Sequence, residues 1–164
     1  MIALRKADLE DAKAIHAMQV RAFQSLLDKY QDYGTNPAAE PIEKVLARMR
    51  MENSYYYFIL LGNVAVGAIR IVDNGMGCRV SPIFILPEYQ GHGYAQQAMM
   101  QAESLYAQAL HWELSTIQEE PMLCHLYEKL GYRRTGTAML IQPGMTIVGY
   151  EKYRNGKEEN NGNL

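Results

Sequence analysis

The chain has 164 residues, of which 48% are hydrophobic and 21% charged, and a formal net charge of -2. This length and composition predict one globular domain with its own core. The slight negative charge and the lack of a basic cluster argue against a general nucleic-acid or anionic-membrane surface. Two isolated cysteines, Cys78 and Cys124, argue against a disulfide framework or a zinc site. The longest apolar run, residues 55–61, is too short to span a membrane. We therefore expect a soluble, cytoplasmic protein.

The first third of the chain favours one strand and two helices. Residues 2–6 predict a short strand, and residues 8–23 predict a helix whose N-cap is Asp8. A loop follows at 29–41, because glycine, asparagine and proline interrupt the pattern there. Residues 42–51 then predict a further helix.

The middle of the chain predicts three consecutive strands. They cover residues 55–61, 64–72 and about 77–86. A Gly62-Asn63 turn joins the first two, and an Asp73-Asn74-Gly75 turn joins the second and third. These turns predict antiparallel hairpins.

The last part of the chain returns to alternating elements. Residues 91–110 carry the strongest helical period, and a strand is predicted at 111–118. A short helix at 121–130 begins on a proline. Two closing strands lie within 132–153, and the polar residues 154–164 predict a disordered tail. The order β-α-α-β-β-β-α-β-α-β-β predicts an α/β (mixed α+β) protein with helices on both faces of a mixed sheet.

A glycine pair stands between a predicted strand and a predicted helix, in PEYQGHGYAQQAM at 87–99. A phosphate-binding P-loop would need Lys-Ser/Thr after the glycines, and a dinucleotide fingerprint would need a small residue where Gln96 stands. Neither nucleotide-binding motif is therefore present at this glycine pair. The remaining pattern, Gln90-x-x-Gly93-x-Ala95, puts backbone N–H groups at a helix start, where a pyrophosphate can bind. Taken alone, the pattern equally suits a tight corner.

Two flanking motifs resolve this ambiguity. The strand end IFILPEY at 83–89 precedes the glycines, and LYEKLGY follows at 126–132. With the element order, these motifs resemble the GNAT superfamily of acetyl-CoA-dependent N-acetyltransferases over residues 1–153. The resemblance implies a three-layer fold around a central, mixed, mostly antiparallel sheet. It implies a single domain over the same residues.

The resemblance also implies an activity. The protein would be an acyltransferase that uses acetyl-CoA as co-substrate, without a metal, and acetylates a primary amine of a small molecule or peptide. The amine would attack directly in a ternary complex. No nucleic-acid or membrane partner is expected, and the sequence leaves a homodimer open. The competing function is a non-catalytic acyl-CoA-binding or regulatory domain.

The same resemblance assigns the cofactor site. Backbone groups near the strand end would pair with pantetheine, and one N–H in the 83–85 stretch would polarise the thioester carbonyl. The loop after the strand would hold the pyrophosphate. The residues assigned to the cofactor are Ile83, Ile85, Leu86, Gln90, Gly91, His92, Gly93, Tyr94, Ala95 and Tyr127.

Tyr127 matches the family's tyrosine near the departing sulfur. A protonated tyrosine can donate to the thiolate as it leaves. The alternative is that Tyr127 only packs with the leucines of its helix.

The sequence departs from the family where an asparagine commonly contacts the cofactor arm, because Glu120 stands there. A carboxylate lacks the donors of an amide. Glu119 or Glu120 could instead act as the general base that deprotonates the acceptor ammonium. The alternative is acidic capping of the 121–130 helix.

The acceptor would be bound by the first helices and the loop between them. Tyr30 and Tyr33 are the predicted substrate-binding residues, and the neighbouring acidic residues Asp28, Asp32 and Glu40 suit a cationic amine. A solvated polar loop is the alternative.

Overall fold

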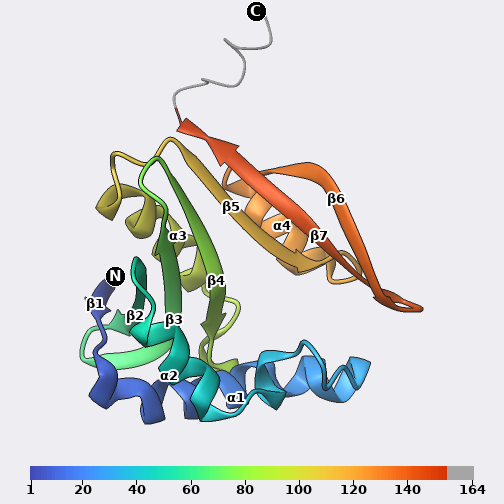
Figure 1. Ribbon diagram of the computed structural model, residues 1–164, viewed down its shortest axis with the longest axis horizontal. Helices are drawn as coiled ribbons and strands as arrows, with labels where there is room; N and C mark the ends of the chain where they lie inside the picture. The colour runs from blue at the N-terminus through green and yellow to red at the C-terminus, as the bar shows by residue number, and fades with distance from the viewer. Residues whose placement is uncertain (155–164) are drawn as a thin grey trace, which may run out of the picture. The chain divides into compact units, whose positions relative to one another are not determined.

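The computed structural model describes residues 1–154, so nearly all of the predicted tail at 154–164 lies outside the described residues. The helices and strands follow the predicted order (Figure 1). They are β1 (Ile2–Lys6), α1 (Ala12–Tyr30), α2 (Ile42–Arg50), β2 (Ser54–Leu61), β3 (Val64–Asp73), β4 (Gly77–Ile85), α3 (Tyr94–Leu105), β5 (His111–Ile117), α4 (Pro121–Lys129), β6 (Arg133–Gln142) and β7 (Met145–Tyr153). Short 3-10 turns are η1 (Leu9–Asp11), η2 (Pro37–Ala39) and η3 (Pro87–Tyr89). Within the described residues, no helix is both long enough and apolar enough to cross a membrane.

The strands form one mixed, seven-stranded sheet with the order β1-β2-β3-β4-β5-β7-β6. β4 and β5 are parallel, whereas β1–β2, β2–β3, β5–β7 and β6–β7 are antiparallel. The chain forms two compact units that share β4. The first unit contains residues 1–72 and 81–105, and the second contains residues 73–80 and those from Tyr106 on. The expectation of a single domain over 1–153 stays a prediction.

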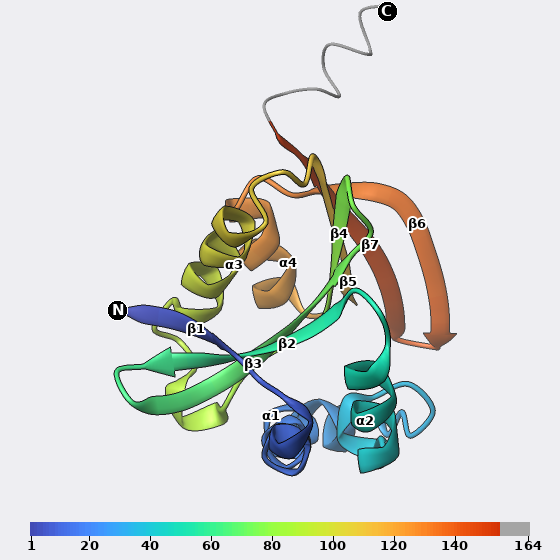
Figure 2. The same cartoon turned by 60° about the vertical axis from the view of Figure 1, so that its left-hand side comes forward.

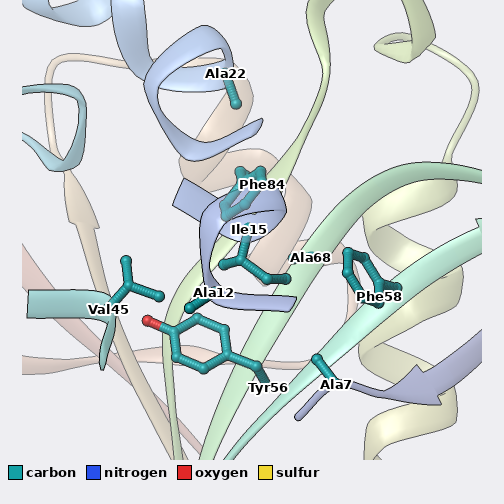
Figure 3. Packing of buried hydrophobic residues seen from close by; sticks show 9 residues of the cluster. All are labelled: Ala7, Ala12, Ile15, Ala22, Val45, Tyr56, Phe58, Ala68 and Phe84. Atoms are coloured by element: carbon teal, nitrogen blue, oxygen red, sulfur yellow. The ribbon is translucent and has the colours of Figure 1, made fainter. Parts of the chain in front are cut away.

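In the first unit, α1 and α2 cover one face of β2 and β3 (Figure 2). The aromatic side chains of Tyr56, Phe58 and Phe84 surround Ile15 of α1 on this face (Figure 3). Val45 of α2 is fully buried in the same cluster. Full burial of an Ile or Phe side chain contributes roughly 1.5–3 kcal/mol. This cluster therefore fixes both helices on the sheet.

The predicted N-cap Asp8 caps the 3-10 turn η1 and not α1, which begins at Ala12 after its own N-cap Asp11. The side chain of Asp8 accepts from the N–H of Glu10, and the side chain of Asp11 accepts from the N–H of Asp8, which completes a capping box on η1. The helix α1 continues past the predicted end at residue 23, because Leu27 is buried and prolongs the apolar stripe. It ends where Gln31 adopts a left-handed conformation and donates its N–H to the carbonyl of Leu27, 2.7 Å away.

The helix α3 is shorter than the predicted 91–110. It begins at Tyr94 and ends at Leu105. The next residue, Tyr106, is buried and packs edge-on against Trp112, with ring centroids 6.2 Å apart. The chain therefore leaves the helix there, although the apolar period continues to Ala109.

In the second unit, α4 covers one face of the strands. Trp112 and Leu114 of β5 are buried, whereas Ser115, on the other face of the strand, is exposed. Tyr150 pairs with Leu114 in the antiparallel register and contacts the ring of Tyr127 on α4. The alternating pattern of β5 therefore directs its apolar side chains toward α4.

Candidate active site

The loop after β4, residues 87–95, is called the cofactor loop below. Leu86, just before the loop, donates its N–H to the carbonyl of Val66 on β3 at 2.8 Å, and Nε2 of Gln90 in the loop donates to the carbonyl of Ile85 at the end of β4 at 2.9 Å. The side-chain amide of Gln90 thus holds the loop to the strand end, and the contact of Gln90 with the cofactor stays a prediction.

Both glycines of the cofactor loop adopt positive φ angles, 82° for Gly91 and 79° for Gly93. A Cβ atom at either position would meet no atom of the described chain within 4 Å. Glycine is therefore required there by backbone conformation and not by crowding. The space above the loop backbone is open to a ligand.

The cofactor loop ends at the first turn of α3. The first helical hydrogen bond runs from the N–H of Gln97 to the carbonyl of Gly93 at 3.1 Å. The N–H groups of the first turn precede this bond and have no acceptor within the helix. Gly91, His92 and Gly93 are exposed, while Tyr94 and Ala95 are partly buried. Open N–H groups at the positive end of a helix fit the pyrophosphate of CoA.

His92 belongs to the internal structure of this loop. Its Nδ1 lies 3.2 Å from the carbonyl of Tyr89, and its ring stacks on Tyr94 with centroids 5.5 Å apart. The imidazole stays exposed. It therefore lies at the loop surface, as the predicted cofactor contact requires.

Tyr127, in the second unit, is 5% exposed. Its ring contacts Tyr132 and Tyr150, each with a centroid distance of 6.2 Å. Burial raises the pKa of Tyr127, and the neighbouring Cys124 raises it further, so the hydroxyl stays protonated at neutral pH. The side chain thus packs in the core and also keeps a proton to donate.

A polar network missed by sequence reasoning supports Tyr127. The hydroxyl of Tyr150 donates to Glu128 at 2.6 Å and accepts from Nε of Arg134 at 3.1 Å. Nη1 of Arg134 donates to the side-chain oxygen of Gln118 at 3.2 Å. Burial and the Glu128 hydrogen bond raise the pKa of Tyr150 to about 12. The motif LYEKLGY contains Glu128, but its partner Tyr150 lies on β7, and no local pattern in the sequence indicates this contact.

The two predicted bases occupy the connection from β5 to α4. Oε1 of Glu119 accepts the N–H of Thr146 at 2.7 Å, which ties this connection to the start of β7. Glu120 occupies the N-cap position of α4, but no side-chain capping hydrogen bond occurs there in the described structure. Glu120 therefore occupies the N-cap position that the capping alternative predicts, but its carboxylate does not make the capping hydrogen bond.

The acceptor loop, residues 31–41, lies in the first unit between α1 and α2. Tyr30 ends α1 with Nζ of Lys29 at 5.2 Å from its ring centre, and Tyr33 is 64% exposed. The carboxylate of Asp32 is buried and accepts from the N–H and hydroxyl of Thr35. This carboxylate thus serves the turn itself.

Glu40, the other acidic residue of this loop, is paired. It accepts two hydrogen bonds from Arg48, at 2.6 and 2.9 Å, and one from Nε2 of Gln19 at 3.1 Å. Burial would raise the pKa of Glu40, but the hydrogen bonds and charge of Arg48 outweigh burial and lower it. Neither Asp32 nor Glu40 therefore presents an unpaired charge to an amine, and Arg48 was not identified from the sequence.

Comparison with known proteins identifies the family. The family model described as an acetyltransferase (GNAT) domain matches residues 26–154. The chain therefore belongs to the GNAT family and is an acetyltransferase, as the motifs predicted. A search of curated proteins returned no match.

Solved structures show the same fold at low sequence identity. The PaiA N-acetyltransferase from Thermoplasma acidophilum, in complex with coenzyme A, matches with a TM-score of 0.75 and 16% identity, over 93% of this chain and 99% of that one. The spermidine N-acetyltransferase from Vibrio cholerae, in complex with CoA and spermine, gives 0.72 and 16%, over 93% and 95%. An acetyltransferase from Thermus thermophilus gives 0.70 and 15%, over 93% and 97%. The mixed, mostly antiparallel fold that the sequence predicted is confirmed.

Proposed function

We propose that this acetyltransferase transfers the acetyl group of acetyl-CoA to a primary amine of a small molecule or peptide. The observation that carries the proposal is the cofactor loop, where Gly91 and Gly93 hold open backbone N–H groups at the start of α3. These groups suit a pyrophosphate, which CoA contains. A structural neighbour solved with coenzyme A supports the same cofactor.

The proposed reaction is direct attack in a ternary complex. The amine nitrogen forms a bond to the thioester carbonyl carbon, and the carbon–sulfur bond breaks. A backbone N–H within the 83–85 stretch stabilises the oxyanion. Tyr127 donates its proton to the leaving thiolate, for which its raised pKa keeps it in the protonated form. No covalent enzyme intermediate is required, so Cys124 has no role in this scheme.

The proton lost by the ammonium goes to Glu119 or Glu120, directly or through water. Glu119 is positioned by its hydrogen bond to Thr146. Glu120 stands where the family commonly has an asparagine, at the N-cap position of α4. Replacing each carboxylate by an amide, E119Q and E120Q, identifies the base, because glutamine keeps an oxygen acceptor but cannot take the proton.

The acceptor is proposed at the level of its class. The Vibrio cholerae neighbour was solved with spermine, which supports a polyamine as one member of that class. Tyr30 and Tyr33 stay the proposed contacts, through their rings and not through Asp32 or Glu40. A non-catalytic acyl-CoA-binding domain is not favoured, because the chain belongs to an acetyltransferase family.

The test is thiol release from acetyl-CoA across a panel of polyamines, amino acids and lysine-containing peptides. We expect turnover with at least one primary amine, and we expect Tyr127→Phe to lower kcat about a hundredfold. Tyr132→Phe removes a hydroxyl from the adjacent buried ring and is the matched control for packing. Tight CoA binding without turnover on any amine would leave the non-catalytic function as the correct one.

A further inference from the structure

One ion pair joins α1 to the cofactor loop. Nη2 of Arg21 donates to both carboxylate oxygens of Glu88, at 2.6 and 3.0 Å. The two residues are 67 positions apart, and their side chains are 55% and 48% exposed. Glu88 belongs to η3, which leads directly into Gln90 and the two glycines. The pair therefore lies at the start of the cofactor loop, and both of its residues belong to the first unit.

The cofactor loop and the first turns of α3 supply no cationic Lys or Arg side chain of their own. Residues 87–99 contain no Lys or Arg, and Glu88 is their only formally charged residue at pH 7. Hydrogen bonds from Arg21 lower the pKa of Glu88, so its carboxylate stays ionised at neutral pH. An unpaired carboxylate there would repel each negative charge of a bound pyrophosphate.

We propose that Arg21 is a positioning residue for the cofactor: it neutralises Glu88 at the start of the cofactor loop and so permits the CoA pyrophosphate to bind there. This inference rests on the proposed function, because it takes CoA as the ligand. It assigns to α1 a contribution to cofactor affinity in addition to its predicted part in the acceptor site.

Neutralisation makes a different prediction from mechanical support. If the pair only held α1 to the loop, removing either partner would weaken CoA binding equally. If Arg21 offsets the charge of Glu88, then Arg21→Ala weakens binding and Glu88→Gln does not. Glu88→Gln should bind CoA as tightly as the wild type or more tightly, because Arg21 then remains as an uncompensated cation. The double variant should return to the wild-type affinity.

The experiment measures CoA binding by titration calorimetry at 0.02, 0.1 and 0.5 M NaCl. At 0.02 M we expect Arg21→Ala to bind about fivefold more weakly, and at 0.5 M less than about twofold, because salt screens exposed charges. Arg21→Lys should recover most of the affinity, since it keeps the charge while losing the fork geometry. Lys13→Ala removes one charge from an exposed position on the same helix and should bind like the wild type. Thermal unfolding of each variant checks that it is folded.

Three results would overturn the inference while the proposed function survives. They are equal weakening by Arg21→Ala and Glu88→Gln, a double variant as weak as Arg21→Ala, and an effect of Arg21→Ala that does not change with salt. A folded wild-type protein that does not bind CoA would overturn both the inference and the proposed function.

Discussion

Two loops of the first unit, the cofactor loop and the acceptor loop, use their polar groups in opposite ways. In the cofactor loop, Gly91 and Gly93 keep backbone N–H groups at the start of α3 open to a ligand. In the acceptor loop, the polar side chains of Asp32, Asn36 and Glu40 are already engaged with the protein itself.

The difference shows how each kind of site depends on the rest of the fold. A cradle made of backbone N–H groups needs only a glycine conformation and a helix start, both of which are local. A site made of charged side chains depends on which partners the fold brings to those charges. The acidic residues Asp32 and Glu40 of the acceptor loop consequently serve its structure.

Gly93→Val should have the largest effect on the cofactor loop. Valine is strongly disfavoured at a φ of 79°, so the backbone N–H groups should shift away from the pyrophosphate. We expect CoA affinity to fall about a hundredfold, which corresponds to about 2.7 kcal/mol, in titration calorimetry.

The matched control is Gly75→Val, because Gly75 has a φ of 94° in the β3–β4 turn. Like Gly93→Val, it should lose about 2 kcal/mol of free energy of unfolding, but it should keep its CoA affinity. Equal loss of affinity in both variants would show that strain alone, and not the cradle, accounts for the result.

Glu40→Gln should have the next largest effect, on stability. It leaves the partly buried Arg48 without its anion, and we expect the free energy of unfolding to fall by about 2 kcal/mol in urea denaturation. Glu43→Gln, at an exposed position on α2, should change it by less than about 0.5 kcal/mol.

The Glu40 prediction also has a pH dependence. The pKa of Glu40 is lowered in the folded state, so its stabilisation is present above the unfolded value of about 4.3 and is lost as the pH falls through the folded value. The difference in free energy of unfolding between the wild type and Glu40→Gln should therefore narrow on acidification. A gap that stays constant from pH 7 to pH 3 would argue that the charge of Glu40 is not what stabilises the loop.

Tyr33→Ala should have the smallest effect. Its side chain is 64% exposed, so stability should change by less than about 0.5 kcal/mol. If its ring binds a cationic amine, the KM for the amine should rise about threefold in steady-state assays while the KM for acetyl-CoA stays the same. Tyr33→Phe keeps the ring and should resemble the wild type; unchanged KM in both variants would remove Tyr33 from the acceptor site.

Much of the fold was predictable because its signals are local. The hairpin turns at Gly62 and Gly75 and the proline at the start of α4 predicted boundaries within one or two residues. The prediction was wrong at the end of α3, where Tyr106 packs on Trp112 although the helical period continues. Tertiary packing outweighed helix propensity at that point.

The same distinction between local signals and tertiary contacts applies to the candidate site. By itself, the amino-acid sequence determined the order of the elements and the position of the cofactor loop, because glycine conformation and helix termini depend on neighbouring residues. Only the tertiary structure decided that Gln90 anchors the loop, that Arg48 takes the charge of Glu40, and that Arg21 pairs with Glu88. A charged side chain acts through partners that the fold brings together, and the partner of Glu88 lies 67 residues away in the chain.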